Sequence, residues 1–274
     1  MSQEAGNRPA RRRPMKRLRT VTLLTDFGER DYYVGAVKGV LLRLAPECRL
    51  VDLCHQIAPG DLEHAAFVLG AAAREYPEGT VHLAVVDPGV GSDRRILAAR
   101  ADGQLAVAPD NGLLTEFLAR CQNPEVRSVL CSDLFLDRPG ATFDGRDRLA
   151  PTAAYLARGE PYDDLGPLII DALSLPTTAP ERRRHGLSGR VVHIDHFGNI
   201  VTNLPSDWLD GRPFTVRVGG ARIDRLVRHY SELADGEAAV IPGSLGTLEL
   251  SLNRGNLAAV TQVSRGKNVE IEFR

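Results

Sequence analysis

Three short apolar runs in the first third of this chain end on aspartates, residues that can hold cations, sugar hydroxyls or protons. The runs are Thr22 to Asp26, Arg49 to Asp52 and Leu83 to Asp87. Runs of this kind, separated by helical patterns, are typical of buried parallel strands. Ligands of such sheets bind beyond the carboxyl ends of the strands. We therefore expect several carboxylates around one cleft at this edge, and we predict the functional site there.

The segment from Val86 to Arg95 carries the strongest local signal. A glycine-rich turn follows Asp87, and Arg94 returns seven positions later. An arginine that folds back on an aspartate keeps the carboxylate ionised and fixes its direction. The alternative is a structural turn closed by an ion pair at the surface, and the segment alone leaves both interpretations open.

Two further segments could bind a nucleoside. Asp26, before Phe27-Gly28, could accept hydrogen bonds from the vicinal hydroxyls of a ribose, although capping of the next turn is the alternative. Phe197 and Asn199 could stack on a purine and read its edge, although a Gly-Asn turn between strands would also explain them. Neither GxGxxG after a strand nor GxxxxGK[ST] is present, so phosphate groups are not the expected point of recognition.

Alternating strand and helix patterns must position these residues. Helical spacing runs from Tyr32 to Leu44 with Asp31 as the expected N-cap. Asp61 likewise precedes a second helix as its expected N-cap, and this helix ends near Pro77. Asp102-Gly103 between two apolar runs is a strong hairpin signal. The other expected elements are strands over Ile96 to Ala101, Gln104 to Ala108 and Val126 to Leu130, and helices over Leu113 to Arg120 and from near Asp147.

Towards the C-terminus, short alternating runs separated by Gly and Asn predict a small, mainly antiparallel domain, a sandwich or barrel. These runs are Arg190 to Ile194, Phe214 to Val218, Ala238 to Ile241, Thr247 to Leu252 and Val269 to Phe273. The predicted fold class is α/β, with an N-terminal α/β sheet domain and a smaller C-terminal β domain. The expected boundaries are a disordered basic tail over 1–18, the N-terminal domain over 19–175, a linker over 176–187 and the C-terminal domain over 188–274.

The composition favours an ordinary globular protein. The chain has 274 residues, 43% of them hydrophobic and 25% charged, with a formal net charge of -1, so no overall field attracts nucleic acid or an anionic membrane. The basic segment from Arg8 to Arg19 could be a nucleic-acid or membrane arm, but we interpret it as a solvated tail. No apolar stretch approaches the ~18 to 20 residues of a membrane span. We expect no nucleic-acid partner and no membrane partner.

The cysteines and histidines show no metal-binding pattern. The four cysteines have no CxxC spacing and suit a reducing cytosol. The histidines are isolated and lack metal-ligand spacing. We expect a cytoplasmic protein with no bound metal.

Taken together, several ordered segments resemble one family, the S-adenosyl-L-methionine (SAM) hydrolases that form adenosine. They are also called SAM hydroxide adenosyltransferases and are related to fluorinase and chlorinase. The resemblance runs from about Thr20 to the C-terminus. The matching segments are Leu24 to Gly28, Val86 to Gly91, Pro109 to Leu114, Phe143 to Asp147, Asp195 to Asn199 with Thr202-Asn203, and Gly243 to Glu249 with Asn253 and Gly255-Asn256.

The resemblance implies an N-terminal α/β domain, a C-terminal β domain and a homotrimer whose sites lie between subunits. It implies that Asp26 holds the ribose hydroxyls and that Phe197 and Asn199 contact the adenine. The methionine part of the substrate is assigned by the resemblance to Asp195 and Ser244, with Glu249 nearby. SAM is the expected substrate, and no cofactor is expected.

This sequence departs from the family at one residue of an Asp-Arg-His set, which the resemblance implies positions and activates water. Asp87 and Arg94 match its first two members, but Asp144 stands where the family has histidine, within Phe143 to Asp147. Asp144 could still accept a proton or hold Arg94, although aspartate is a weaker base than histidine at neutral pH. We therefore take Asp87, Arg94 and Asp144 as the expected catalytic residues.

The expected reaction is hydrolysis of SAM to adenosine and L-methionine by attack of water at C5′ of the ribose. One alternative is a SAM- or adenosine-binding protein with little turnover because of Asp144. Another is a metal-dependent phosphohydrolase that holds magnesium with Asp26, Asp52 and Asp87. A halogenase is disfavoured, since Val81 to Ile96 leaves little length for a loop that encloses a halide.

Overall fold

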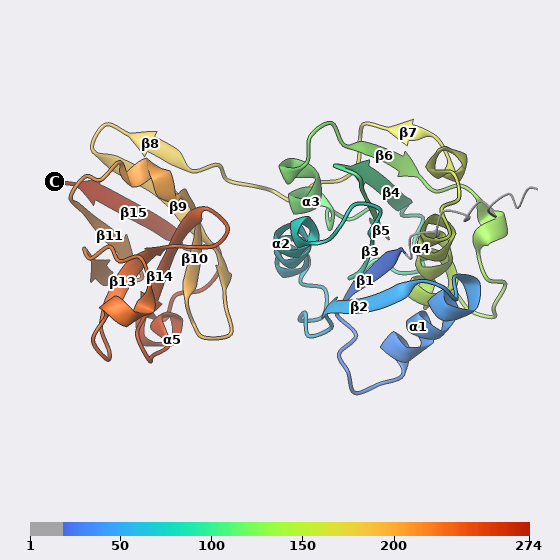
Figure 1. The fold of residues 1–274 in the computed structure, drawn as a ribbon, viewed down its shortest axis with the longest axis horizontal. Coiled ribbons are helices and arrows are strands. Elements are labelled where there is room, and N and C mark those ends of the chain that lie inside the picture. The colour runs from blue at the N-terminus through green and yellow to red at the C-terminus, as the bar shows by residue number, and fades with distance from the viewer. Residues whose placement is uncertain (1–18) are drawn as a thin grey trace, which may run out of the picture. The chain divides into compact units, whose positions relative to one another are not determined.

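The computed structural model describes residues 19–274, and the predicted basic tail over residues 1–18 lies outside the described residues. The described chain forms two compact units. The first contains the residues up to Pro59, Tyr76–Pro109 and Gln122–Ile170, and the second contains Gly60–Glu75, Asp110–Cys121 and Asp171–Arg274. Each unit is built around its own sheet (Figure 1).

The first unit has a seven-stranded mixed sheet in the order β2-β1-β3-β5-β4-β6-β7. β1, β2, β3 and β5 pair in parallel, which confirms the parallel strands predicted from the apolar runs. β4, β6 and β7 complete the sheet by antiparallel pairing. The strands are Thr20–Thr25 (β1), Arg49–Cys54 (β2), Val81–Val85 (β3), Ile96–Ala101 (β4), Gln104–Pro109 (β5), Glu125–Ser128 (β6) and Leu168–Ile169 (β7).

The strand order defines where a ligand can bind in this sheet. The chain passes from β1 to β2 on one side and then returns past β1 to β3 on the other. The order therefore reverses between β1 and β3, and open α/β sheets bind ligands beyond the carboxyl ends of the strands at such a reversal.

The predicted hairpin is confirmed. Ala101 of β4 is paired with Gln104 of β5, and the residues between them, Asp102 and Gly103, have φ angles of 49° and 75°. Two consecutive positive φ angles are those of the tight turn that suits the twist of paired strands, which is why Asp-Gly is favoured there.

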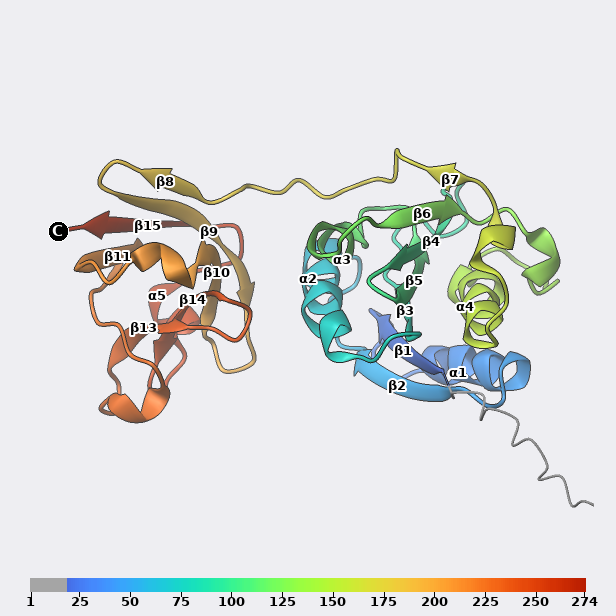
Figure 2. The same cartoon turned by 45° about the horizontal axis from the view of Figure 1, so that its top comes forward.

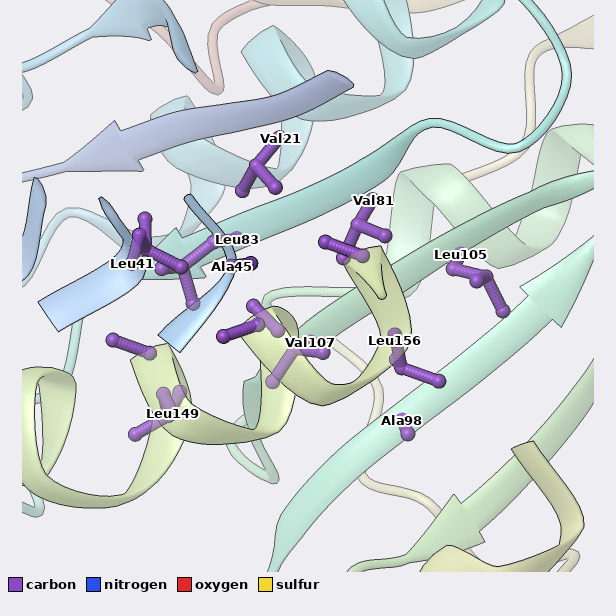
Figure 3. Packing of buried hydrophobic residues seen from close by; sticks show 14 of the residues in the cluster. Val21, Leu41, Ala45, Val81, Leu83, Ala98, Leu105, Val107, Leu149 and Leu156 are labelled. Atoms are coloured by element: carbon purple, nitrogen blue, oxygen red, sulfur yellow. The ribbon is translucent and has the colours of Figure 1, made fainter. Parts of the chain in front are cut away.

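Two helices of the first unit, α1 (Tyr33–Leu44) and α4 (Ala150–Ala157), pack side by side, as both views show (Figure 1, Figure 2). A π-helical turn, η3 (Gly145–Leu149), leads directly into α4. Figure 3 shows apolar side chains gathered between α4 and the strands, among them Leu83, Val107 and Leu156. The unit also contains the 3₁₀ turns η2 (Ser132–Leu134) and η4 (Tyr162–Leu165).

The prediction of Asp31 as the N-cap of α1 was wrong. The helix begins at Tyr33, its N-cap is Tyr32, and no side chain caps it. The ring centroid of Tyr33 lies 5.7 Å from that of Phe27 and 5.2 Å from that of Phe143. Packing of these aromatic rings accompanies the helix start, so tertiary contacts take the place of the expected local capping bond.

The expectation that the second apolar run ends on Asp52 was also wrong, because β2 continues to Cys54. β2 is the edge strand of the sheet, and an edge strand tolerates a charged side chain that reaches solvent. Asp52 forms an ion pair there with Lys38 of α1 at 2.6 Å.

The second unit contains an eight-stranded sheet in the order β12-β11-β15-β9-β10-β14-β13, with β8 paired to β9. All of its ladder pairs are antiparallel, and this mixed architecture confirms the predicted fold class. The strands are Glu181–Arg183 (β8), Gly186–Ile194 (β9), Ile200–Pro205 (β10), Phe214–Val218 (β11), Ala221–Ile223 (β12), Ala238–Pro242 (β13), Thr247–Leu252 (β14) and Asn268–Phe273 (β15). β8 and the start of β9 fall in the range 176–187 that we expected to be a linker.

Short helices complete the second unit. Asp61 precedes α2, and its Oδ1 accepts a hydrogen bond from the backbone N–H of His64 at 3.1 Å, which confirms the predicted cap. The helices and turns of this unit are α2 (Leu62–Ala72), η1 (Ala73–Glu75), α3 (Thr115–Arg120), η5 (Ser206–Leu209), η6 (Tyr230–Glu232) and α5 (Leu257–Thr261). Within residues 19–274, no helix has both the length and the apolar character needed to cross a bilayer.

Candidate active site

Asp87 and Arg94 form a buried, two-pronged ion pair just beyond β3. Nε of Arg94 donates to Oδ1 of Asp87 at 2.6 Å, and Nη2 donates to Oδ2. The two side chains are only 6% and 8% exposed. The pair is therefore not the surface ion pair of the alternative interpretation, and its geometry is the fork arrangement that fixes both groups in direction.

Asp144 joins this pair from the start of the π-helical turn. Its Oδ2 accepts a hydrogen bond from Nη2 of Arg94 at 2.7 Å, and its side chain is 7% exposed. Nη1 of Arg148 lies 3.5 Å from the same oxygen. Arg94 thus lies between two carboxylates, and its Nη1 is buried with no hydrogen-bond partner among the described residues.

The charge state of Arg94 follows from these contacts. Burial alone would lower the pKa of the Arg94 guanidinium, but hydrogen bonds and charge attraction from Asp87 and Asp144 outweigh burial and raise that pKa. Arg94 therefore remains a cation at neutral pH. It can donate hydrogen bonds and stabilise negative charge, but it cannot serve as a base.

The π-helical turn sets the approach of Asp144 to the sheet. Gly145 follows it, and a Cβ at Gly145 would lie 3.0 Å from Cγ1 of Val85 and 3.3 Å from Cζ of Phe27. The absence of a side chain thus lets the turn lie close to the end of β3. π-Helical turns are rare in proteins, and those that occur are often found at functional sites.

Asp26 lies at the neighbouring strand end. Thr25 of β1 is paired with Val85 of β3, so Asp26 and Asp87 follow adjacent parallel strands at the edge where the strand order reverses. The ring centroid of Phe27, the next residue, lies 5.7 Å from those of Tyr33 and Phe143, and Tyr32 is 65% exposed. Asp26, Asp87, Arg94 and Asp144 are therefore all placed at one edge of the first sheet.

The loop between β9 and β10 carries three other predicted residues. Oδ1 of Asp195 accepts hydrogen bonds from the backbone N–H groups of Phe197 at 2.9 Å and Asn199 at 2.8 Å. Gly198 has a φ of 85°, and a Cβ there would lie 2.1 Å from Cγ of Asn256, so the turn requires glycine. Asp195 therefore shapes this loop, a function that sequence reasoning did not assign to it.

A pocket of 570 Å³ opens beside this loop in the second unit. Phe197 is 73% exposed and Asn199 only 6%. The amide Nδ2 of Asn199 donates to Oδ2 of Asp195 at 2.7 Å and to the hydroxyl of Tyr230 at 3.3 Å, so its Oδ1 is the atom left to accept from a ligand. The lining residues are Asp195, Phe197, Asn199, Tyr230, Glu249, Leu252, Arg254 and Gly255.

Tyr230 is the main pocket residue that sequence reasoning missed. Its hydroxyl donates to Oε1 of Glu249 at 2.5 Å. Burial and this hydrogen bond raise the pKa of the Tyr230 phenol, so the group stays neutral and donates. A single tyrosine at the start of a short 3₁₀ turn, η6, gives no sequence signal of such a role.

Ser244 lies outside the lining of this pocket. It is exposed in the turn between β13 and β14, which is closed by a hydrogen bond from the backbone N–H of Gly246 to the oxygen of Gly243. A Cβ at Gly243 would lie 3.5 Å from Oε2 of Glu249, so the turn is next to the pocket wall.

The structure does not group Asp26, Asp52 and Asp87 as the magnesium ligands that a metal-dependent phosphohydrolase would require. Across residues 19–274, no three His, Cys, Asp or Glu side chains are grouped so that they could hold a metal ion. Asp52, one of the three expected ligands, instead contacts Lys38 at 2.6 Å and His55 at 3.0 Å.

The fold and site define a two-unit protein. It has a buried aspartate–arginine cluster at a parallel sheet edge and an aromatic pocket on an antiparallel unit. The chain belongs to the SAM hydroxide adenosyltransferase family, whose N-terminal domain model matches residues 21–166 and whose C-terminal domain model matches residues 189–270. This membership confirms the resemblance drawn from the ordered motifs.

Curated relatives cover nearly the whole chain. Proteins named (R)-S-adenosyl-L-methionine hydrolase are 39% identical in Thermus thermophilus and 37% identical in Salinispora tropica. These matches cover 93% and 92% of this chain and 100% and 97% of the relatives. A fluorinase from Actinopolyspora mzabensis is 28% identical over 92% of this chain and 96% of its own. The crystal structure of an uncharacterized conserved protein from Thermotoga maritima is similar with a TM-score of 0.86 and 34% identity, over 92% of this chain and 99% of that one.

Proposed function

We propose that this protein hydrolyses SAM to adenosine and L-methionine by attack of water at C5′ of the ribose. The observation that carries the proposal is the buried cluster of Asp87, Arg94 and Asp144, with one guanidinium nitrogen that has no partner among residues 19–274. Membership of the family and the names of the relatives support the same reaction.

The reaction depends more on orienting the attacking water than on a general acid that protonates the leaving group. The oxygen of water forms a bond to C5′ while the C5′–S bond breaks, and its electron pair leaves with sulfur as the neutral thioether of methionine. The attacking water loses one proton and becomes the 5′-hydroxyl of adenosine. Because a sulfonium is already a good leaving group, the site must mainly hold water in line with the breaking bond and exclude bulk solvent.

We assign the handling of water to the cluster in the first unit. Nη1 of Arg94 is a buried donor that can bind the water oxygen and stabilise the negative charge that develops on it. Asp87 fixes the guanidinium plane through its two-pronged contact. The released proton passes to a carboxylate, Asp87 or Asp144, since the raised pKa of Arg94 prevents it from accepting one.

We assign substrate binding to both units. Asp26 holds the ribose hydroxyls at the strand reversal, where a carboxylate suits two vicinal donors. Phe197 stacks on the adenine, and Oδ1 of Asn199 accepts from its amino group, which the orientation of the Asn199 amide supports.

For the methionine end of the substrate, we propose Asp195, Ser244 and Glu249. The two carboxylates line the pocket and favour an ammonium group. The hydroxyl of Ser244, in the exposed turn next to the wall, is the donor we assign to the substrate carboxylate.

We propose a homotrimer in which the first unit of one subunit meets the second unit of its neighbour. The high exposure of Phe197 in the isolated chain supports this, because an adenine-stacking ring needs a cover to exclude water. The unpartnered, buried Nη1 of Arg94 is a second sign of a half-complete site.

We further propose a cytoplasmic location, which the thiol state of Cys48, Cys54 and Cys131 supports.

The names of the relatives specify the (R) form of the substrate. Because "L-methionine" already defines the amino-acid centre, the prefix describes the configuration at sulfur. We propose that this chain also acts on the (R) sulfonium, without a cofactor or metal.

The test is adenosine formation from SAM by the pure full-length protein, with the sulfonium epimers assayed separately. We expect adenosine and methionine in equal amounts, faster from the (R) epimer, and unchanged by a chelator. Asp144→His is assayed in parallel, and we expect it to be at least as active as the wild type because histidine is the stronger base. Calorimetric binding of adenosine without product in the wild type would instead identify a binding protein.

A further inference from the structure

A buried histidine, His55, forms hydrogen bonds with residues before and after Asp26. His55 follows β2, and its side chain is 2% exposed. Its Nδ1 lies 2.8 Å from Oγ1 of Thr25, the residue before Asp26. Its backbone oxygen accepts a hydrogen bond from the backbone N–H of Gly28 at 2.8 Å.

The hydrogen bonds assign the proton of this histidine. Oγ1 of Thr25 accepts from the backbone N–H of Phe27 at 3.3 Å, so its own hydroxyl proton is available to His55. Because the carboxylate of Asp52 lies opposite Nε2, we assign the ring proton to Nε2 and take Nδ1 of His55 as the acceptor from Thr25. Nε2 is 3.0 Å from Oδ1 of Asp52, within ion-pair distance but outside hydrogen-bond geometry. Lys38 contacts the other oxygen of Asp52 at 2.6 Å.

This row of contacts keeps Asp52 ionised. Burial alone would raise the pKa of Asp52, but Lys38 and His55 outweigh burial and lower that pKa. A carboxylate opposite Nε2 favours a proton on Nε2 and leaves Nδ1 free to accept.

An irregularity in the sheet brings His55 to this position. Leu23 is paired with Asp52, but Leu24 is paired with Cys54, so β2 contains one extra residue there. An extra residue of this kind re-aims the chain that follows it. Here it moves His55 one residue along, next to the end of β1.

We infer that His55 and Thr25 are positioning residues that hold the Asp26 carboxylate in the direction required by the ribose hydroxyls. The inference rests on the ribose role proposed for Asp26. Neither residue is assigned a contact with substrate; they fix the backbone on each side of Asp26, so the turn does not have to be ordered when the substrate binds.

The chain offers a matched pair of variants as a test. Oγ1 of Thr22, also in β1, lies 2.8 Å from Nδ1 of a second buried histidine, His82. Thr25→Val and Thr22→Val remove the same hydroxyl from side chains that are 1% and 0% exposed, but only Thr25 adjoins Asp26.

The measured quantity is the ratio of the dissociation constants of 2′,3′-dideoxyadenosine and adenosine, by calorimetry on the full chain. Hydrogen bonds to a charged group predict that the wild type prefers adenosine by at least about tenfold. We expect Thr22→Val to keep this ratio and Thr25→Val to reduce it to about threefold or less. A merely structural effect would weaken both nucleosides equally and leave the ratio unchanged.

A second pair of variants covers the case in which Thr25→Val does not fold. His55→Asn keeps an amide near the position of Nδ1, whereas His55→Gln places it near Nε2. We expect the asparagine variant to retain the ratio and the glutamine variant to lose it. If Thr25→Val and His55→Gln both keep the wild-type ratio of dissociation constants, the inference is overturned but the ribose role of Asp26 still stands. If the ratio falls equally in Thr22→Val and Thr25→Val, the inference is overturned as well. A wild-type protein that binds both nucleosides equally overturns the ribose role of Asp26 and the inference with it.

Discussion

At the scale of single residues, the charge balance around Arg94 explains how this site accommodates Asp144. An added buried carboxylate without a partner would be strongly destabilising. Here Asp144 receives a hydrogen bond from Arg94 at 2.7 Å, and Arg148, four residues later, supplies a second positive charge at 3.5 Å. The negative charge of Asp144 is therefore compensated by Arg94 and by Arg148, which lies in the same π-helical turn.

The contact between Asp87 and Arg94 predicts a large effect of Asp87→Asn. Asparagine cannot form the charged two-pronged contact, so we expect kcat to fall by about 10² to 10⁴ with little change in KM. The free energy of unfolding should fall by on the order of 3 kcal/mol, since a buried charge loses its partner. Steady-state kinetics and urea unfolding measure both.

The control is Glu272→Gln, which breaks the similar two-pronged contact with Arg217 at 3.1 and 3.0 Å. Those side chains are 57% and 54% exposed, so we expect little change in the free energy of unfolding and full activity. An Asp87→Asn enzyme with wild-type kcat would contradict the role of the cluster.

His82 predicts how stability depends on pH. Burial lowers the pKa of His82 from 6.5 to about 4, and the residue is 0% exposed. The unfolded chain therefore binds a proton that the folded chain excludes between these values, so the free energy of unfolding falls as pH falls through this window, by about 3 kcal/mol. Urea unfolding at neutral pH and near pH 4 measures the loss. His82→Gln should show a smaller loss, and an equal loss in both proteins would rule out this cause.

At the scale of elements, local signals predicted some boundaries well. The bounds of β11 and β14 agree with the predicted runs, and Asp102-Gly103 and Asp61 act as a turn and a cap because their own backbone and side chains suffice. Asp31 failed as a cap, since the rings around Tyr33 accompany the helix start instead. The π-helical turn has no comparable signal, because it depends on packing against the end of β3.

The same distinction applies to the site. Asp87 and Arg94 could be proposed as a pair because one turn connects them, and the structure places them in contact. Tyr230 and His55 could not, since each reaches its place through partners far away in the sequence, Glu249 and Thr25. Sequence reasoning thus reaches residues whose geometry is local and misses those placed by tertiary contacts.

The π-helical turn predicts that Gly145→Ala impairs catalysis. A methyl group there would meet side-chain atoms of Val85 and Phe27 at 3.0 and 3.3 Å. These side chains or the turn must then shift by a few tenths of an ångström, and we predict that the turn moves and takes Asp144 with it. We expect kcat to fall by about tenfold or more, because a small misplacement of a catalytic group is costly. The measurement is steady-state kinetics with SAM.

Gly39→Ala is the matched control for that substitution. Gly39 is exposed within α1, and a Cβ there would meet nothing within 4 Å. We expect this variant to keep full activity and to gain about 0.5 to 1 kcal/mol in stability, since alanine is the better helix former. If Gly145→Ala behaved in the same way as Gly39→Ala, the turn would not control the position of Asp144.

At the scale of the whole molecule, the proposed groups are divided between two units. The cluster of Asp87, Arg94 and Asp144 belongs to the first unit, and the pocket with Phe197 and Tyr230 belongs to the second. In the proposed trimer, each site combines the first unit of one subunit with the second unit of another. Such a site can be rebuilt from two chains that are each defective in a different unit.

This division predicts complementation between two inactive variants. Arg94→Lys keeps the charge but loses the two-pronged contact, and the double variant Phe197→Ala, Tyr230→Ala removes the aromatic pocket walls. Each alone should lose most activity. When both chains are produced together in equal amounts and mix at random, about a third of the sites in mixed trimers pair two intact halves. This is about a quarter of all sites, so activity should recover to about a quarter of the wild-type value.

The control is the same mixture with both defects placed in one chain and a wild-type chain as its partner. Shared sites then leave about a quarter of the sites intact, whereas sites within one subunit leave about half. Two affinity tags and mass spectrometry verify that mixed trimers form. If mixed trimers form and the two single-unit variants still show no more than the sum of their separate activities, each subunit completes its own site, and the exposure of Phe197 requires a different explanation.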